Sequence, residues 1–285
     1  MKEKIVSRST PERRVWRMGT DRSPSSVRDH LAGEEPLEIR VGGRSLAVTM
    51  RTPGDDFDLA AGFLVSEGVV AQRDELSVMR YCAGKGDDGL NRFNVLDLTL
   101  GGGVAPPDES VARAFFTTSS CGLCGKASID AVRTRSRFEV RSDPLRAPVE
   151  LIVSLPARLR EAQAIFSTTG GLHAAALFSA EGELLVVRED VGRHNAVDKV
   201  VGWALREGRL PLRESILLVS GRASFELVQK AVMAGVAMLC AVSAPSSLAV
   251  DLAEESGVTL IGFVRDPSMV VYSHRERVTA RPPQS

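Results

Sequence analysis

Polar and apolar residues alternate in two stretches of the first hundred positions. Residues 37–50 contain two alternating runs separated by two glycines, which predicts a β-hairpin. Residues 91–100 alternate in the same way and predict a further strand. Between them, residues 55–68 begin with acidic side chains, space their apolar residues as a helix does and end with glycine. The pattern predicts a small β-rich α+β domain over residues 36–116.

In the second half of the chain, predicted helices and strands alternate more regularly. Residues 146–165 predict helical segments, and residues 172–188 form two strand-like runs around an acidic turn. Residues 215–219 are continuously apolar, as expected of a parallel strand covered on both faces. The other predicted elements are helix 194–206, helix 224–234, strand 238–242, helix 246–255 and strand 258–264. This order predicts a three-layer α/β sandwich over residues 146–274, with right-handed crossovers.

The two ends of the chain lack such a pattern. Residues 1–35 are rich in arginine and serine without periodicity, so we expect a disordered tail. Residues 275–285 are expected to form a second tail, and residues 117–145 a loop and a helix between the two folded parts. The basic first residues are not followed by an apolar stretch, which argues against a secretory signal. No apolar run reaches the ~18 residues of a membrane helix.

Composition narrows the classes of function. The 285 residues include 36 basic and 36 acidic side chains, and this balance gives no general attraction to nucleic acid. Four cysteines are too few for a disulfide scaffold. We therefore expect a reduced, cytoplasmic protein that binds neither nucleic acid nor a membrane.

Cys121 and Cys124 form a C-x-x-C pair. Such a pair can hold half of a zinc site, act as a redox dithiol or present a nucleophilic thiolate. Because the further cysteines, Cys82 and Cys240, are isolated and the four histidines lack paired spacing, a four-ligand zinc site is disfavoured. The flanking serine, threonine and glycine residues favour an exposed loop, in which Lys126 and a helix N-terminus would lower a thiol pKa. The sequence therefore favours a reactive thiol, and two buried small residues without a chemical role are the alternative.

Three loops of the second half lead from a strand into a helix: residues 189–195, 220–224 and 243–247. Helix N-termini offer unpaired N–H groups and a positive dipole end, which suit phosphate oxygens. Arg193 and Arg222 add further donors. Because ligands of open α/β sheets bind beyond the carboxyl ends of the strands, the loops predict a site for an anionic, nucleotide-like ligand. Capping of helices and turns by the same residues is the alternative.

The candidate ligand contacts lie in the first two of these loops and in the glycine-rich turn before residue 173. His173 could be a ligand contact or a structural histidine. The candidates are His173, Arg193, His194, Asn195, Ser220, Gly221 and Arg222.

The order of elements also matches the cytidine-deaminase-like fold. Zinc deaminases of this fold open one helix with H-x-E and the next with P-C-x-x-C. Here the first position has His194-Asn195-Ala196 and the second Ser220 to Ser224, so the general acid/base glutamate and both thiolates are absent. We expect the fold without deaminase chemistry, and a residual zinc enzyme with a ligand at His194 is the disfavoured alternative.

Several blocks resemble the FdhD family of formate dehydrogenase accessory sulfurtransferases. They are SSCGLCGK, TGGLHAAALF, EDVGRHNAVDKVVG, SGRASFELVQKAV, SAPSSLAVDLA and LIGFVR, and EDVGRHNAVDK is highly specific. The resemblance extends from about residue 37 to residue 274. It implies a cytoplasmic homodimer of deaminase-like fold that takes sulfur from a cysteine desulfurase. The sulfur would pass to the bis(molybdopterin guanine dinucleotide) cofactor of formate dehydrogenase.

The resemblance also implies residue roles. Cys121 would carry sulfur as a persulfide, and Cys124 would assist as a resolving or relay thiol. A cofactor-binding segment, with Arg265 as a phosphate or pterin donor, would follow the last predicted strand. It consists of Phe263, Val264, Arg265, Asp266, Pro267 and Ser268. No permanent metal of the protein's own is expected. The alternative is a non-catalytic protein that binds the molybdenum cofactor and docks it onto the apoenzyme.

Overall fold

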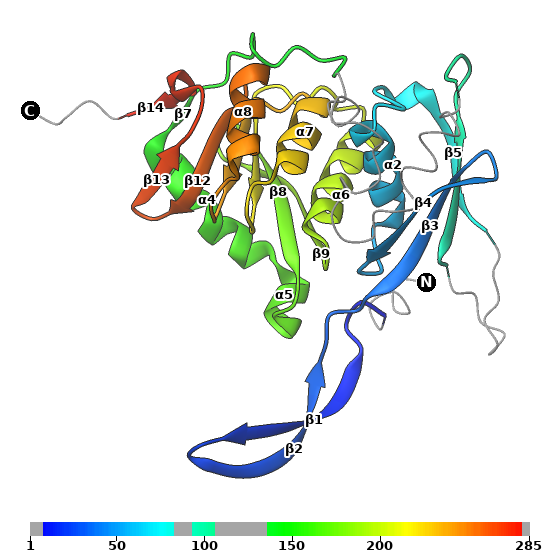
Figure 1. Ribbon diagram of the computed structural model, residues 1–285, viewed down its shortest axis with the longest axis vertical. Helices are drawn as coiled ribbons and strands as arrows, with labels where there is room; N and C mark the ends of the chain where they lie inside the picture. Colours follow the sequence, from blue (N-terminus) through cyan, green and yellow to red (C-terminus); the bar gives the residue numbers. More distant parts are fainter. Residues whose placement is uncertain (1–7, 83–92, 106–135, 281–285) are drawn as a thin grey trace, which may run out of the picture.

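The computed structural model describes residues 8–82, 93–105 and 136–280 (Figure 1). The strands of the second half are β8 (His173–Ser179), β9 (Leu184–Asp190), β10 (Ser215–Val219), β11 (Met238–Ala241), β12 (Thr259–Arg265) and β13 (Ser268–Val271). They form one sheet in the order β13-β12-β11-β10-β8-β9. β10, β11 and β12 are parallel, whereas the other pairings are antiparallel. The predicted strands are confirmed, and β13 is an addition to them.

Helices pack on this sheet. They are α4 (Val149–Ala162), α5 (Ala164–Thr169), α6 (Arg193–Arg206), α7 (Phe225–Met233) and α8 (Ser247–Ser256). α4 contacts β8, β9, β10 and β12, whereas α6, α7 and α8 pack against one another in series. The predicted alternation of helices and strands is confirmed, and the likeness to the deaminase fold stays a prediction. No helix within the described ranges is long and apolar enough to span a bilayer.

The first half builds a second, four-stranded sheet. Its elements are β3 (Glu35–Val41), β4 (Arg44–Arg51), α2 (Asp56–Ser66), the 3₁₀ helix η1 (Arg73–Glu75), β5 (Leu76–Tyr81) and β6 (Val95–Leu100). The strand order is β4-β3-β6-β5. The predicted hairpin, with its glycine turn, and the predicted helix are both confirmed.

The two halves share one hydrophobic core, which includes residues of both sheets. α2 of the first half lies beside α6 of the second, so that α8, α7, α6 and α2 form a row (Figure 1). The expected boundary near residue 146 therefore separates two sheets and not two independent cores.

The contact between α2 and α6 depends on two glycines. A Cβ atom added to Gly62 would lie 1.8 Å from the carbonyl oxygen of Asp198, and one added to Gly202 would lie 1.8 Å from that of Asp58. Such distances are impossible, so the two helix backbones can approach this closely only where both side chains are absent.

The expectation of a disordered tail over residues 1–35 is wrong for residues 12–30. β1 (Glu12–Gly19) and β2 (Arg22–His30) form an antiparallel hairpin in which Val15 lies opposite Val27. Most of the described side chains of the hairpin are exposed. A strand pair without a buried face has no apolar alternation, so the hydrophobic pattern could not reveal it.

The expected tail over residues 275–285 is also wrong in its first part. β14 (Val278–Thr279) pairs in parallel with β7 (Ala147–Pro148). Just before it, the buried Arg277 donates to the carbonyl oxygens of Gly257, Val140 and Arg141 at 2.8–3.1 Å. A hydrophobicity pattern assigns every arginine to the surface, so it could not reveal that Arg277 is buried against backbone carbonyl groups.

Replacing Gly202 by alanine tests the close helix contact. We expect Gly202→Ala to lower the free energy of unfolding by about 3 kcal/mol, because the new methyl group forces the helices apart. Gly102→Ala is the matched control, since an added Cβ there meets no atom within 4 Å. Urea unfolding measures both values, and equal stability of the two variants would contradict the proposed constraint.

Candidate functional site

The loops predicted to bind a ligand meet at one edge of the large sheet. The N–H of Ser243 donates to the carbonyl oxygen of Gly221 at 3.4 Å, and the N–H of Phe263 donates to that of Ser243 at 3.2 Å. Ser220 exchanges hydrogen bonds with Ala174, at the start of β8, at 2.9 Å. We call this edge, formed by residues 173–174, 191–195, 220–224 and 243–246, the loop edge.

Three predicted basic residues come together at the loop edge: His173, Arg193 and His194. Burial and then the charge of Arg193 lower the pKa of His173. A Cβ on Gly221 would lie 3.4 Å from Nδ1 of His173, so Gly221 leaves the ring open on that side. Arg193 is the first residue of α6, and its Nε atom is buried without a hydrogen-bond partner in the described part of the chain. An unpaired guanidinium nitrogen at a helix N-terminus favours an anion.

His194 is a neutral member of this cluster. Its Nε2 atom lies 3.5 Å from Oγ of Ser224 and 3.8 Å from a carboxylate oxygen of Glu226. Burial, followed by the charges of Lys230 and Arg193, lowers the pKa of His194 to about 4. At neutral pH the imidazole is therefore a hydrogen-bonding group without charge.

Glu226 is a site residue that the sequence did not suggest. Burial raises its pKa, but the Ser224 hydroxyl, its own backbone N–H and the charge of Arg193 together bring it below the ordinary value. Its carboxylate is thus ionised beside the basic cluster. A signal was present, since a serine two residues before an acidic residue often marks a helix start.

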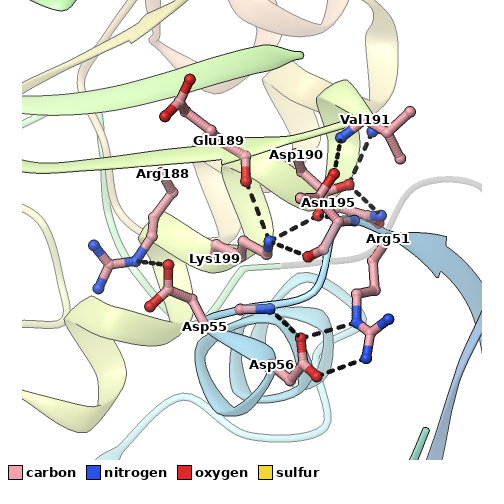
Figure 2. Close-up of polar contacts among 12 residues, drawn as sticks. Arg51, Asp55, Asp56, Arg188, Glu189, Asp190, Val191, Asn195 and Lys199 are labelled. Atoms are coloured by element: carbon pink, nitrogen blue, oxygen red, sulfur yellow. Dashed lines mark hydrogen bonds and ion pairs between the residues drawn. The ribbon is translucent and has the colours of Figure 1, made fainter. Parts of the chain in front are cut away.

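Asp190 organises the turn at the start of α6, and Figure 2 shows it beside Asn195 and Lys199. It is fully buried, and one carboxylate oxygen accepts from the N–H of Gly192 at 2.8 Å and from Nδ2 of Asn195 at 2.9 Å. The other oxygen accepts from the N–H of Thr52 at 3.1 Å and forms an ion pair with Lys199 at 2.8 Å. Four donors on one carboxylate fix the start of α6 against β4.

Asn195, predicted as a ligand contact, has a structural role. One amide hydrogen goes to Asp190 and the other to the carbonyl oxygen of Met50 at 2.7 Å. Its amide oxygen accepts from the Thr49 hydroxyl at 3.3 Å. Both donors of Asn195 are thus used inside the protein, so this side chain cannot donate to a ligand in this arrangement.

The segment implied by the resemblance forms the corner between β12 and β13. Phe263 has a left-handed backbone (φ 53°) and a side chain that is 41% exposed, within an irregularity of the β12–β13 pairing. A bulky residue rarely adopts this conformation, and bulges near sites redirect side chains. Val264 was also predicted to contact the ligand. Its side chain is fully buried, so only its backbone groups are available for such a contact. Arg265 is exposed and pairs with Ser268.

Three further predicted site residues are Cys121, Cys124 and Arg222. Cys121 and Cys124 lie outside the described residues, as does the helix expected to follow them. Arg222 is an exposed side chain of the loop edge. Cys240 is buried in the core, and its burial raises the pKa of the thiol. Among the described residues, no three His, Cys, Asp or Glu side chains are grouped so that they could hold a metal ion.

The pKa of His194 predicts an acid-sensitive fold. The folded pKa of about 4 lies below the ordinary value of 6.5. Between these pH values the unfolded chain binds a proton that the folded chain does not, so stability falls as the pH decreases from 6.5 towards 4. The loss from this residue is about 3 kcal/mol. We expect His194→Gln to flatten the pH dependence of the unfolding free energy in this window, and an unchanged slope would contradict the assignment.

Comparison with known proteins shows the family to which this chain is similar. The model of the FdhD/NarQ family matches residues 32–279. A Mycolicibacterium paratuberculosis protein named "Sulfur carrier protein FdhD" is 62% identical over 248 residues, covering 87% of this chain and 91% of that protein. A Streptomyces avermitilis protein of the same name is 61% identical over 277 residues, covering 97% and 98%.

A solved structure shows the same fold. The crystal structure of a Desulfotalea psychrophila protein assigned as a formate dehydrogenase accessory protein aligns with a TM-score of 0.73 at 22% sequence identity. The alignment covers 95% of this chain and 99% of that chain. With the family match over most of its length, this chain belongs to the FdhD/NarQ family.

Proposed function

We propose that this chain is a sulfur carrier that serves formate dehydrogenase. The observation that carries the proposal is the presence of both C-x-x-C cysteines, Cys121 and Cys124, in a chain that is 61% identical to a named sulfur carrier over nearly its whole length. The structural relative is assigned as a formate dehydrogenase accessory protein, which supports the same client.

The proposed chemistry uses Cys121 as the sulfur acceptor. Its thiolate attacks the outer sulfur of a persulfide on a cysteine desulfurase. A bond forms between Cys121 Sγ and that sulfur, the donor's S–S bond breaks, and the donor cysteine leaves as a thiolate. The product is a persulfide on Cys121, and Cys124 is positioned in sequence to act as a second thiol.

The proposed acceptor of the sulfur is the client's bis(molybdopterin guanine dinucleotide) cofactor, held at the loop edge by its nucleotide ends. The unpaired Nε of Arg193 and the N-terminus of α6 fit a phosphate group. Neutral His194 can hydrogen-bond without adding charge. The exposed ring of Phe263 offers a surface for a purine or pterin, and Arg265 lies two residues away.

Other implications of the resemblance remain predictions. These are a homodimer, a cytoplasmic location and the deaminase-like arrangement, for which the order β9-β8-β10-β11-β12 is the support.

Mass spectrometry tests the carrier role. After incubation with a cysteine desulfurase and cysteine, we expect the wild-type chain to gain the mass of one sulfur atom and Cys121→Ala to gain none, because the accepting thiolate is gone. Cys82→Ala is the control and should still be loaded. If Cys121→Ala activates formate dehydrogenase as well as wild type does, the protein is a cofactor-docking chaperone and not a sulfur carrier.

Nucleotide affinity tests the loop edge. We expect Arg193→Gln to weaken guanosine diphosphate binding at least about tenfold, because a charge-assisted contact to phosphate is lost. Arg73→Gln, on the exposed η1, is the matched control and should bind as wild type does. Calorimetric titration measures both, and equal affinities of the two variants would remove Arg193 from the site.

A further inference from the structure

A groove with a volume of about 770 Å³ separates the first sheet from the end of α6. One wall consists of η1 and the first residues of β5, and the other of the last turn of α6 and the residues that follow it. The volume lies within the usual range of ligand sites, about 300–1,000 Å³. None of the lining residues belongs to the loop edge, so the groove is a separate candidate site.

The groove has an apolar floor. Leu205 is buried, and Leu76, Met79 and Leu210 are partly buried against the hydrophobic core. Apolar side chains that remain partly exposed in a groove are covered favourably by other apolar groups. The floor therefore favours a ligand that brings apolar side chains.

The rim of the groove carries charge of both signs. Arg73 and Asp74 are exposed on the η1 wall, and Glu207 is exposed on the opposite wall. A carboxylate on each wall disfavours a phosphate or a nucleotide, because like charges repel. A peptide can bring apolar side chains together with charges of both signs, so it matches an apolar floor with a mixed rim.

β5 is an end strand of the first sheet, and no strand of the described ranges pairs with its outer edge. Figure 1 shows β5 at the outer side of the molecule, away from the large sheet. The N–H of Cys82 donates to the carbonyl oxygen of Val95 on β6 at 2.9 Å, so by alternation the backbone groups of Met79 and Tyr81 point to the outer edge. An edge of this kind accepts an extended peptide as an added strand, and alternate side chains of that strand would enter the groove.

The groove borders the two points at which the segment containing Cys121 is attached. The N–H of Gly101, shortly before the described chain stops at residue 105, donates to the carbonyl oxygen of Glu75 at 2.8 Å. Arg137, just after the described chain resumes at residue 136, pairs with the carboxylate of Glu75 at 2.5 Å. Both attachment points are therefore at η1, which forms a wall of the groove. A sulfur donor in the groove would be held beside the attachment of the segment that carries the sulfur acceptor.

The groove and the loop edge lie at opposite ends of α6. Arg193 begins the helix at the loop edge, and Arg206 ends it at the groove. The 14 residues of α6 extend about 20 Å at ~1.5 Å per residue. A protein bound in the groove therefore leaves the proposed cofactor site free. This separation favours the donor of the sulfur, and not the client that receives it, as the occupant of the groove.

We propose that the groove binds an extended peptide segment of the cysteine desulfurase, which pairs with the outer edge of β5 and places apolar side chains over Met79 and Leu205. Backbone hydrogen bonds to β5 supply affinity, and the apolar floor selects the side chains that enter it. The identity of the partner rests on the proposed sulfur transfer, whereas the site rests on the groove and on the outer edge of β5.

Loading of Cys121 from two different donors tests the docking separately from the chemistry. Ser77→Arg places a long charged side chain at an exposed position of the groove wall. We expect it to raise the KM for a purified cysteine desulfurase at least about tenfold, because the peptide is displaced. Glutathione persulfide passes its outer sulfur to the Cys121 thiolate while glutathione leaves as a thiolate, and it should load the variant at the wild-type rate.

Thr99→Arg is the matched control. It introduces the same side chain at an exposed position of the neighbouring strand β6, outside the groove, and should keep the wild-type KM for the desulfurase. Equal KM values for the two variants, with both folded by circular dichroism, would overturn the proposal. If glutathione persulfide does not load wild-type Cys121, the carrier role itself is overturned, and the second measurement still tests the groove.

The second measurement is amide hydrogen exchange of the wild-type chain, which needs no variant. We expect the desulfurase to slow exchange over residues 76–81, because the outer N–H groups of Met79 and Tyr81 become hydrogen-bonded to the added strand. Exchange at the loop edge should not change. A desulfurase complex in which exchange of β5 is unaltered would overturn the proposal. Slower exchange of β5 with formate dehydrogenase apoenzyme, and not with the desulfurase, would also overturn it.

Discussion

The carboxylate of Asp190 is the point on which the arrangement of this protein depends. It ends β9, accepts hydrogen bonds from the turn into α6 and from Thr52, the residue after β4, and pairs with Lys199. Lys199 in turn donates to the carbonyl oxygens of Thr52 and Glu189 at 3.0 and 3.2 Å, so each of its protons has a partner. A buried pair is tolerated only when its remaining donors and acceptors are satisfied, and removing one partner costs about 3–5 kcal/mol. The first sheet and the start of α6 are therefore fixed to each other by a polar network centred on Asp190.

The same interface contains a second buried pair, which connects stability to the electrostatics of the site. Lys230 of α7 donates to both carboxylate oxygens of Asp198 at 2.7 and 2.8 Å, and the Ser66 hydroxyl of α2 donates to the same group at 2.6 Å. The charge of Lys230 is also one of the causes that keep His194 neutral. Because α2 and α6 cross at the glycine contact, these charges are held at fixed distances from the loop edge.

The sequence predicted the elements of this fold better than it predicted their polar contacts. Continuous or alternating apolar runs reveal strands that bury a face, and the topology of an α/β sheet then brings the loops after β10 and β11 together. A hydrophobic pattern carries no information about hydrogen bonds, so it missed the exposed β1–β2 hairpin and the buried Arg277. It also placed Asn195 among the ligand contacts, although that amide joins β4 to α6. Glu226 was missed because a carboxylate at a helix start is ordinarily explained by capping.

The motif EDVGRHNAVDK is specific because one short segment performs two tasks. Asn195 and Lys199 are four residues apart and therefore lie on one face of α6, where both contact Asp190. Arg193 and His194 precede them in the first turn, at the loop edge. A substitution in the first group moves the turn that carries the second, so the two sets of residues cannot vary independently. The spacing of the motif fits a helix whose start meets a buried carboxylate on one side and presents Arg193 and His194, the proposed ligand contacts, on the other.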